Sequence, residues 1–464
     1  MNGKWELGCY LLDLKPDVNI ANMFLGCLRR AGIDDNEEVN IRVEPEVLKL
    51  TTSCNGRQLN SSIGRTSGIT LKPDTIGELS WADATTIQCR VTVETLVTDI
   101  DDGTPEDLIS QIRGDINLSS FRDQLSTAGF RVCCAQCLHT LSEDTEPNKI
   151  HFHTLPGNNW EEAADNWFCH PKTSQSRDIL NSLRTMNPKP DIAFLNDSYT
   201  IVNKSILDSN SYQLSETNSG RSSVVSCSRC LAELGCLCSK GAPVASAFQL
   251  YHVCVHLLPL PGAEQLSTSA FSDYLCRRFI DHDRYYAWLL LSHRISDTSV
   301  KFAIKSLSET PRLLVWLLDS YSYFVRGQMM PCGGCQPSKP HHELISEEVN
   351  NLKMDANHGV DISERFVDND QRSTLDESVS DPLANAPSQP FPVIKVLFKI
   401  FDETSANSDP RANGFDYSVT SIQLPDKACD ELSEILLKST QSLPVPIRSL
   451  GAFHVGYLKL ADKC

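Results

Sequence analysis

The sequence is short of positive charge, of aromatic side chains and of long apolar runs. Its 464 residues hold 42 Lys and Arg against 59 Asp and Glu, a formal net charge of −17. Clustered basic residues are what neutralise a phosphate backbone, and no basic stripe with interleaved aromatics is present, so we expect no direct binding to nucleic acid. The longest apolar stretches, such as Leu313 to Leu318, are far too short to span a bilayer, so we expect no membrane association.

Residues Met1 to Leu14 lack the features of a secretory signal peptide. They have no basic start, no long apolar run and no small-residue cleavage site. The 18 cysteines are therefore expected in a reducing compartment, as metal ligands, core thiols or reactive thiols instead of disulfides. We expect a soluble, intracellular protein whose acidity favours protein partners with a basic face.

Two Cys-x-x-Cys pairs are the strongest chemical signal in the chain. They are Cys134 with Cys137 and Cys227 with Cys230, each beside a short run of β-type residues. Two thiolates from one tight turn can bind one soft metal ion, and two such turns supply the four ligands of a tetrahedral zinc site. The alternative is two unrelated pairs of core thiols, because free cysteine is among the most buried residue types. Since four thiolates leave no open position on the metal, the predicted Zn²⁺ is structural.

Other thiols lie close to these pairs in the sequence. Cys133, Cys236 and Cys238 stay open as substitutes for a member of the set, although none has the Cys-x-x-Cys spacing. A third close pair, Cys332 with Cys335, contains two glycines, and we predict a flexible turn there, with metal binding or oxidation as the alternative.

A Cys-His pair lies between the two knuckles. Asn159 to Glu162 is typical of a helix start, and Pro171 ends the predicted helix, so Cys169 and His170 fall at its C-terminal end. The helix dipole is negative there and disfavours a thiolate, so activation of Cys169 would come from His170, Lys172 or a metal. The functional interpretations are a thioester-forming nucleophile or a ligand for a partner's metal; the alternative is a half-buried thiol beside an ordinary histidine cap.

Hydrophobic periodicity predicts an α+β chain that is rich in antiparallel β-sheet and has few helices. Residues Ile87 to Val93 alternate between apolar and polar, which is typical of a half-buried strand, and Leu313 to Leu318 is predicted to be a buried strand. The remaining predictions are strands around Tyr199 to Val202, Val396 to Ile400 and Phe453 to Tyr457, a helix from Asp426 that ends before Pro444, and surface loops over Lys172 to Pro190 and Asp208 to Ser223.

Composition divides the chain into four regions. We predict a β-rich N-terminal domain over residues 1–125 and a central zinc-knuckle region over 126–335. Residues 336–390 are polar, acidic and nearly free of aromatics, so they are predicted to form a disordered loop. Residues 391–464 are predicted to form a strand-helix-strand segment that packs on the core.

The chain resembles the HECT-like proteins that bind ubiquitin-conjugating enzymes. The motifs that carry the resemblance are Cys-Ala-Gln-Cys at 134–137, Leu-Pro-Gly-Asn-Asn-Trp at 155–160, Trp-Phe-Cys-His-Pro at 167–171, Cys-Ser-Arg-Cys at 227–230, Leu-Val-Trp-Leu-Leu-Asp at 314–319 and Ile-Lys-Val-Leu-Phe at 394–398. The pair Cys332 with Cys335 and the long acidic insertion depart from the family pattern, and no HECT active-site motif is recognisable.

The resemblance implies an E3 ubiquitin-protein ligase of the cytoplasm and nucleus. Such a protein accepts ubiquitin from an E2 conjugating enzyme and transfers it to protein substrates for proteasomal degradation. The E2 is expected to contact Val244 to Phe271, within the central region. Cys169 beside His170 is the first candidate for a transferring thiol, and Cys429, a predicted core residue, is the second. If the protein only positions a charged E2, no catalytic cysteine is needed.

Two non-enzymatic hypotheses stay open. The Trp-Phe-Cys-His-Pro element also resembles a motif with which other proteins occupy the metal site of metallo-β-lactamase-type RNA-processing nucleases. In that case Cys169 and His170 would supply ligands to the di-zinc centre of a pre-mRNA 3′-end processing endonuclease, and the protein would be its assembly factor. The other hypothesis is a zinc-stabilised scaffold whose acidic residues 336–389 recruit basic partners.

Overall fold

A computed structural model of the protein describes residues 9–26, 39–44, 47–54, 57–63, 69–83, 85–96, 118–155, 187–196, 198–216, 223–238, 247–260, 282–297, 300–328, 330–331, 390–412 and 416–460. Cys169 and His170, the helix predicted before them, the pair Cys332 with Cys335 and the predicted acidic loop over 336–389 lie outside the described residues.

The largest sheet has eleven strands, which pair antiparallel except for one parallel pair, β18 with β22. Its strands are β1 (Cys9–Lys15), β2 (Ile20–Gly26), β6 (Ile69–Leu71), β7 (Gly77–Asp83), β8 (Thr86–Leu96), β18 (Lys301–Lys305), β19 (Pro311–Gln328), β21 (Phe391–Ile400), β22 (Thr420–Gln423), β23 (Ser449–Leu450) and β24 (Phe453–Lys459). Their main order is β23-β24-β21-β19-β1-β2-β8-β6. The alternation predicted from Ile87 to Val93 is confirmed in β8, where Ile87, Cys89, Val91 and Val93 are buried in the core.

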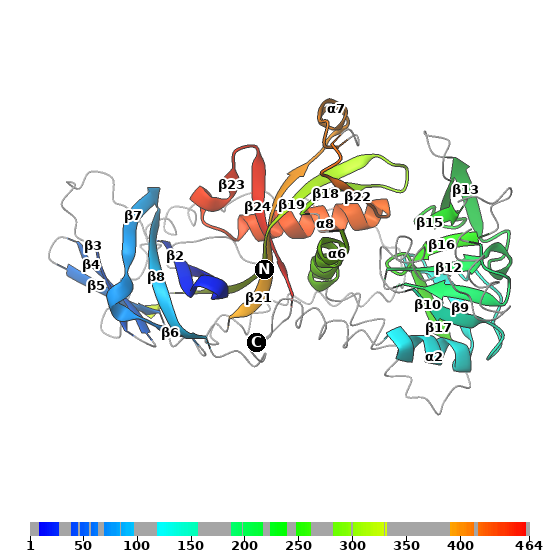
Figure 1. Ribbon diagram of the computed structural model, residues 1–464, viewed down its shortest axis with the longest axis horizontal. Coiled ribbons are helices and arrows are strands. Elements are labelled where there is room, and N and C mark those ends of the chain that lie inside the picture. Colours follow the sequence, from blue (N-terminus) through cyan, green and yellow to red (C-terminus); the bar gives the residue numbers. More distant parts are fainter. Residues whose placement is uncertain are drawn as a thin grey trace, which may run out of the picture.

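Helices α6 (His282–Asp297) and α8 (Asp426–Gln441) pack against one face of this sheet, as Figure 1 shows. The predicted C-terminal helix is therefore confirmed, and it ends before Pro444. Leu432 and Leu436 lie one turn apart and are fully buried, while Ile435 packs at the margin of the same core. Burial of such a leucine contributes about 2 kcal/mol to folding.

Strand β19 is the longest strand of the sheet and shifts register past Leu317. The strand predicted at Leu313 to Leu318 is thus confirmed, but its continuous burial is wrong. Leu313 and Leu317 face the helices, whereas Trp316 and Leu318 on the other face are 37% and 45% exposed. In an antiparallel strand successive side chains point to opposite faces, so an apolar run does not bury every member.

A second sheet of seven strands packs with a two-stranded sheet around a separate core. The seven strands are β10 (His151–Thr154), β11 (Ile192–Leu195), β12 (Tyr199–Asn203), β13 (Tyr212–Glu216), β14 (Ser223–Cys227), β15 (Glu233–Cys238) and β16 (Ala247–Tyr251), and the two are β9 (Phe130–Cys134) and β17 (Val255–Pro259). The predicted loop over Asp208 to Ser223 is wrong in part, because β13 lies within it and pairs with β14. Its Tyr212 packs on the core while Leu214 is exposed, so too few residues alternate to signal a strand.

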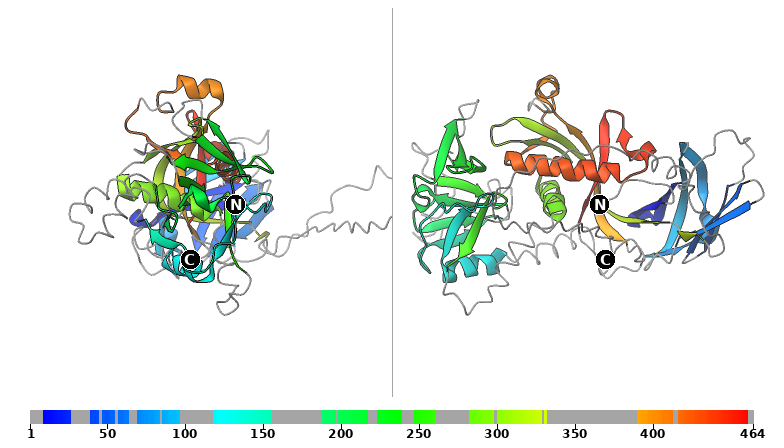
Figure 2. Two further views of the ribbon diagram at one scale, coloured as in Figure 1. Left: turned by 90° about the vertical axis from the view of Figure 1, so that its right-hand side faces the viewer. Right: turned by 180° about the vertical axis from the view of Figure 1, so that it is seen from behind.

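The other described elements are a four-stranded sheet, two helices and four 3₁₀ turns. They are β3 (Val39–Glu44), β4 (Val47–Cys54), β5 (Arg57–Ile63) and β20 (Met330–Pro331); α2 (Leu118–Ala128) and α7 (Glu403–Ser408); η1 (Pro16–Val18), η2 (Pro73–Thr75), η3 (Lys204–Ile206) and η5 (Val445–Ile447). The four-stranded and seven-stranded sheets lie at opposite ends of an elongated molecule, with α6 and α8 between them (Figures 1 and 2). The predicted fold class is confirmed: the described residues form antiparallel sheets with few helices.

The large sheet joins segments that are far apart in the sequence. It takes strands from residues 1–125, 126–335 and 391–464, three of the four regions predicted from composition. The boundaries of those regions stay a prediction.

No helix among the described residues is both long enough and apolar enough to cross a membrane.

Candidate metal centre

The two Cys-x-x-Cys turns have nearly the same backbone geometry. One follows β9 and the other follows β14, so a strand delivers the first cysteine of each pair. In the first turn the Cys134 N–H donates to the His139 carbonyl at 2.9 Å, and in the second the Cys227 N–H donates to the Ala232 carbonyl at 2.8 Å. These bonds close each turn and direct both of its sulfurs to one side, as zinc knuckles require.

The structure brings the four sulfurs together. All four Sγ atoms lie within 4.8 Å of one another, although about ninety residues separate the pairs. The distances are 3.6 Å between Cys134 and Cys230 and 3.7 Å between Cys137 and Cys227. A tetrahedral zinc with Zn–S bonds of about 2.3 Å separates its sulfurs by about 3.8 Å, whereas a disulfide would bring them to about 2.0 Å. The predicted four-cysteine set therefore fits a single metal ion.

The nearby thiols are not part of this set. Among the described residues, the group of close sulfurs consists of the two Cys-x-x-Cys pairs, and Cys133, Cys236 and Cys238 fall outside it. Cys133 follows the alternation of β9, which sends its side chain to the face opposite that of Cys134.

The thiols of Cys134, Cys137 and Cys230 differ in their pKa. Burial raises the pKa of Cys134 to about 12 and also raises the pKa of Cys230. Burial acts in the same direction on Cys137, but hydrogen bonds from the His139 N–H and the neighbouring thiols outweigh it and lower the pKa of Cys137 to about 7. Because a metal binds thiolates, loading this cluster releases protons, and its affinity for a metal falls as the pH falls.

A leucine follows each Cys-x-x-Cys pair and has an unusual backbone conformation. Leu138 and Leu231 have positive φ angles of 56° and 61°, and they are 64% and 65% exposed. Each N–H donates at 2.9 Å to the carbonyl of the first cysteine of its own turn. The shared sequence Cys-x-x-Cys-Leu is the signal that marks these two positions as equivalent.

The second candidate for a transferring thiol, Cys429, is a core residue. It lies on α8, has no exposed surface and packs against the large sheet. Burial raises the pKa of its thiol to about 12. The thiolate is the nucleophile in thioester chemistry, so this site does not support a nucleophilic role. The first candidate, Cys169 with His170, lies outside the described residues.

Comparison with known protein families gives a match over most of the chain. Residues 28–455 match the family described as HECT-like ubiquitin-conjugating enzyme (E2)-binding. The chain belongs to this family.

Three mammalian relatives share one name, which describes each of them as an E3 ubiquitin-protein ligase. The protein of Mus musculus is 22% identical over 453 residues, which cover 97% of each chain. The protein of Bos taurus is 23% identical over 322 residues, or 66% of this chain and 67% of its own, and that of Pongo abelii is 22% identical over 341 residues, or 70% of this chain and 72% of its own. The shared name does not refer to a nuclease, so the comparisons do not support the assembly-factor hypothesis.

Proposed function

We propose that this protein is an E3 ubiquitin-protein ligase that accepts ubiquitin from an E2 and passes it to protein substrates, which favours their proteasomal degradation. The observation that carries the proposal is the family match over residues 28–455, which includes both cysteine knuckles. The full-length similarity to a mouse protein named as such a ligase supports it. We place this activity in the cytoplasm and nucleus, which imaging of a fluorescent fusion would test.

The cysteine cluster fits a structural role for Zn²⁺ in this activity. Four thiolates fill a tetrahedral ion, so the metal would have no position for a substrate. Its effect would be on the neighbouring strands: β17 pairs with β9 so that Val255 lies opposite Cys134, and the Ala135 N–H donates to the Cys254 carbonyl at 2.9 Å. The segment expected to contact the E2, Val244 to Phe271, contains β17. Metal binding would thus stabilise the position of β17 within the segment expected to contact the E2.

Two routes of transfer are compatible with the family. In the covalent route the Cys169 thiolate attacks the E2–ubiquitin thioester, takes over the ubiquitin acyl group and releases the E2 thiol, with His170 as the neighbouring base. In the other route the protein positions a charged E2 and the acyl group passes directly to the substrate lysine. We propose the covalent route, since Cys169 is not one of the four predicted metal ligands and is followed directly by a histidine.

A reconstituted transfer assay tests the proposal. The zinc-loaded protein is mixed with a set of ubiquitin-charged E2 enzymes, and discharge of the E2 and ubiquitylation of protein lysines are followed on reducing and non-reducing gels. We expect a thiol-sensitive ubiquitin adduct that Cys169→Ser abolishes and that Cys429→Ser, at the buried core thiol, retains. Full transfer by Cys169→Ser would exclude the covalent route alone. Failure to accelerate discharge of any E2 would contradict ligase activity.

A further inference from the structure

A groove of about 560 Å³ separates the two cysteine knuckles from the first half of helix α8. The wall on the knuckle side is largely apolar and includes Ala135, Leu231, Ala232 and Val253. The opposite wall belongs to α8 and is acidic. The two walls therefore differ in chemistry, which is what distinguishes a recognition groove from a simple gap in packing.

Five carboxylates line the groove: Glu233, Asp426, Asp430, Glu431 and Glu434. Asp426, Asp430 and Glu434 are spaced four residues apart, so they form one stripe along α8. Lys427 is the single cation among the described lining residues, while Arg312 and Lys438 form ion pairs with carboxylates of the stripe from outside it. Negative charge remains in excess on this wall.

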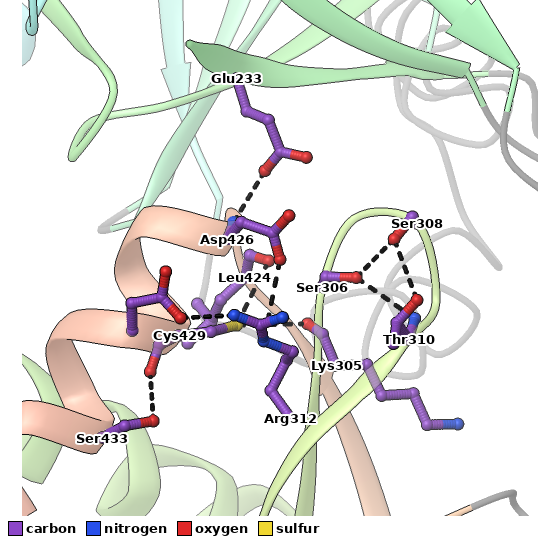
Figure 3. Close-up of polar contacts among 11 residues, drawn as sticks. Glu233, Lys305, Ser306, Ser308, Thr310, Arg312, Leu424, Asp426, Cys429 and Ser433 are labelled. Atoms are coloured by element: carbon purple, nitrogen blue, oxygen red, sulfur yellow. Dashed lines mark hydrogen bonds and ion pairs between the residues drawn. The ribbon is translucent and has the colours of Figure 1, made fainter. Parts of the chain in front are cut away.

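The groove is formed before anything binds. The Glu233 carboxylate on β15 accepts a hydrogen bond from the Asp426 N–H at 2.7 Å, which joins the knuckle side to the start of α8 (Figure 3). A second hydrogen bond joins the same two parts of the molecule: the Tyr251 hydroxyl, on β16, donates to the carbonyl of Gln423, at the end of β22, at 3.4 Å. Because these bonds hold the two walls at a fixed separation, a ligand has little ordering cost to meet.

Leu231 presents an exposed apolar side chain at the edge of this groove. It lines the groove, whereas its equivalent Leu138 in the first knuckle does not. The left-handed backbone of Leu231 comes from its knuckle turn, since Leu138 has the same conformation outside the groove. The knuckle thus holds an apolar contact point rigidly opposite a row of carboxylates.

We propose that this groove binds a short segment of a partner protein in which Lys or Arg side chains alternate with apolar residues. The cationic heads would pair with the α8 stripe, and the apolar side chains and aliphatic stems would pack on Leu231 and Val253. Charge complementarity selects this occupant over an acidic or purely apolar one. The proposal does not depend on ubiquitin transfer.

Peptide binding to the zinc-loaded, full-length protein tests the proposal. The probe is a fluorescein-labelled peptide that repeats Lys-Leu-Ala, and its counterpart repeats Glu-Leu-Ala; binding is followed by fluorescence anisotropy at low and high salt. We expect the lysine peptide to bind, with an affinity that falls as salt rises, and the glutamate peptide to bind far more weakly.

Two matched pairs of variants locate the site. Asp430→Asn with Glu434→Gln removes two ion-paired, exposed carboxylates of the groove, and Glu78→Gln with Asp123→Asn removes two comparable carboxylates elsewhere. We expect the groove pair to weaken binding about fivefold and the distant pair to leave it unchanged.

The second comparison is Leu231→Ala with Leu138→Ala, two changes with the same backbone strain. We expect about threefold weaker binding for Leu231→Ala and unchanged binding for Leu138→Ala. Equal weakening by both charge variants would show general attraction of a polycation to an acidic chain and would overturn the proposal. So would binding that no groove variant alters, equal loss in the two leucine variants, or equal affinity for the glutamate peptide.

Discussion

Leu138 and Leu231 adopt a backbone conformation that the Cys-x-x-Cys turn demands and that leucine disfavours. Their φ angles of 56° and 61° bring Cβ close to the following carbonyl oxygen, which costs about 1–2 kcal/mol at each position. Glycine would adopt the same turn without this strain. The two leucines therefore reduce the stability of the turns that hold the cysteine cluster.

Replacing either leucine by glycine is expected to stabilise the zinc-loaded protein. The relief of strain exceeds the added entropy of glycine in the unfolded chain, so we expect a net gain of about 0.5 kcal/mol per site. Urea denaturation of Leu138→Gly and Leu231→Gly measures it. The matched Leu→Ala variants keep Cβ and should show no gain; destabilisation by both glycine variants would contradict the strain argument.

Asp409 is a buried carboxylate with three charge-assisted contacts. Its oxygens accept hydrogen bonds from Arg411 Nε at 2.8 Å and Nη2 at 2.7 Å, and Lys399 Nζ lies 3.4 Å away. The hydrogen bond from Arg411 is the main reason that the pKa of Asp409 is held well below its usual range. The contacts tie the segment after α7 to β21.

Asp409→Asn is expected to destabilise the protein in a pH-dependent way. Because the pKa is lower in the folded state, the ionised carboxylate contributes stability above the unfolded pKa of about 4, and this contribution is lost as the pH falls through the folded pKa. We expect a loss of about 1–2 kcal/mol at neutral pH that shrinks in acid. Denaturation as a function of pH measures this loss. Glu78→Gln, at an exposed carboxylate, is the control, and its change in the free energy of unfolding should be near zero. A loss that is constant with pH would point to packing instead.

Helix α8 begins without a side-chain cap from its own segment. Its N-cap residue is Pro425, which has no side-chain acceptor, and the cap comes instead from Glu233 on β15. A carboxylate at a helix N-terminus accepts an otherwise unsatisfied N–H and interacts favourably with the helix dipole. The helix start is thus completed by a strand almost two hundred residues earlier in the chain.

Glu233→Ala is therefore expected to destabilise the protein by about 1 kcal/mol, the usual cost of losing an N-cap acceptor. Glu233→Gln keeps an acceptor oxygen and should lose about half as much or less. Thermal denaturation of the two variants measures the difference. Equal losses would mean that packing of the Glu233 stem, and not its hydrogen bond, joins β15 to α8.

Elements with a strong period were predictable, and those shaped by their neighbours were not. Strand β8 and helix α8 each have one apolar and one polar face. The apolar residues therefore recur with the period of the element, as in the alternation of β8 and the spacing of Leu432 and Leu436, and this period is visible in the local sequence. Strand β13 lies at the edge of its sheet and has little apolar surface to bury, so it leaves no such pattern. The partial exposure of Trp316 on β19 depends on what packs over that face.

At the scale of the whole molecule, the cysteine cluster joins two segments that are distant in the sequence. Both belong to one module, which consists of the seven-stranded and two-stranded sheets around their shared core. Its two turns are about ninety residues apart in the sequence and follow strands of different sheets. Both turns also pack on the same hydrophobic core. Metal binding to such a cluster is coupled to folding, because the unfolded chain does not hold the four thiolates together.

Removal of the metal is expected to unfold this module. We expect one zinc per chain by elemental analysis, and loss of both the metal and at least about 3 kcal/mol of stability in Cys230→Ser. Cys236→Ser, at a thiol outside the cluster, should retain both. The readouts are metal content and thermal denaturation with and without a chelator. A protein that purifies without zinc, or a Cys230→Ser variant that keeps it, would contradict the assignment.

The sequence by itself determined the ligand types, the family motifs and the main periodic elements, because each depends on residues close together in the chain. Only the tertiary structure decided that four sulfurs converge, that Glu233 caps α8 and that Leu231 borders an acidic groove. These contacts join segments from ninety to almost two hundred residues apart. Local spacing carries no information on such pairings, since they arise from how whole sheets and helices pack.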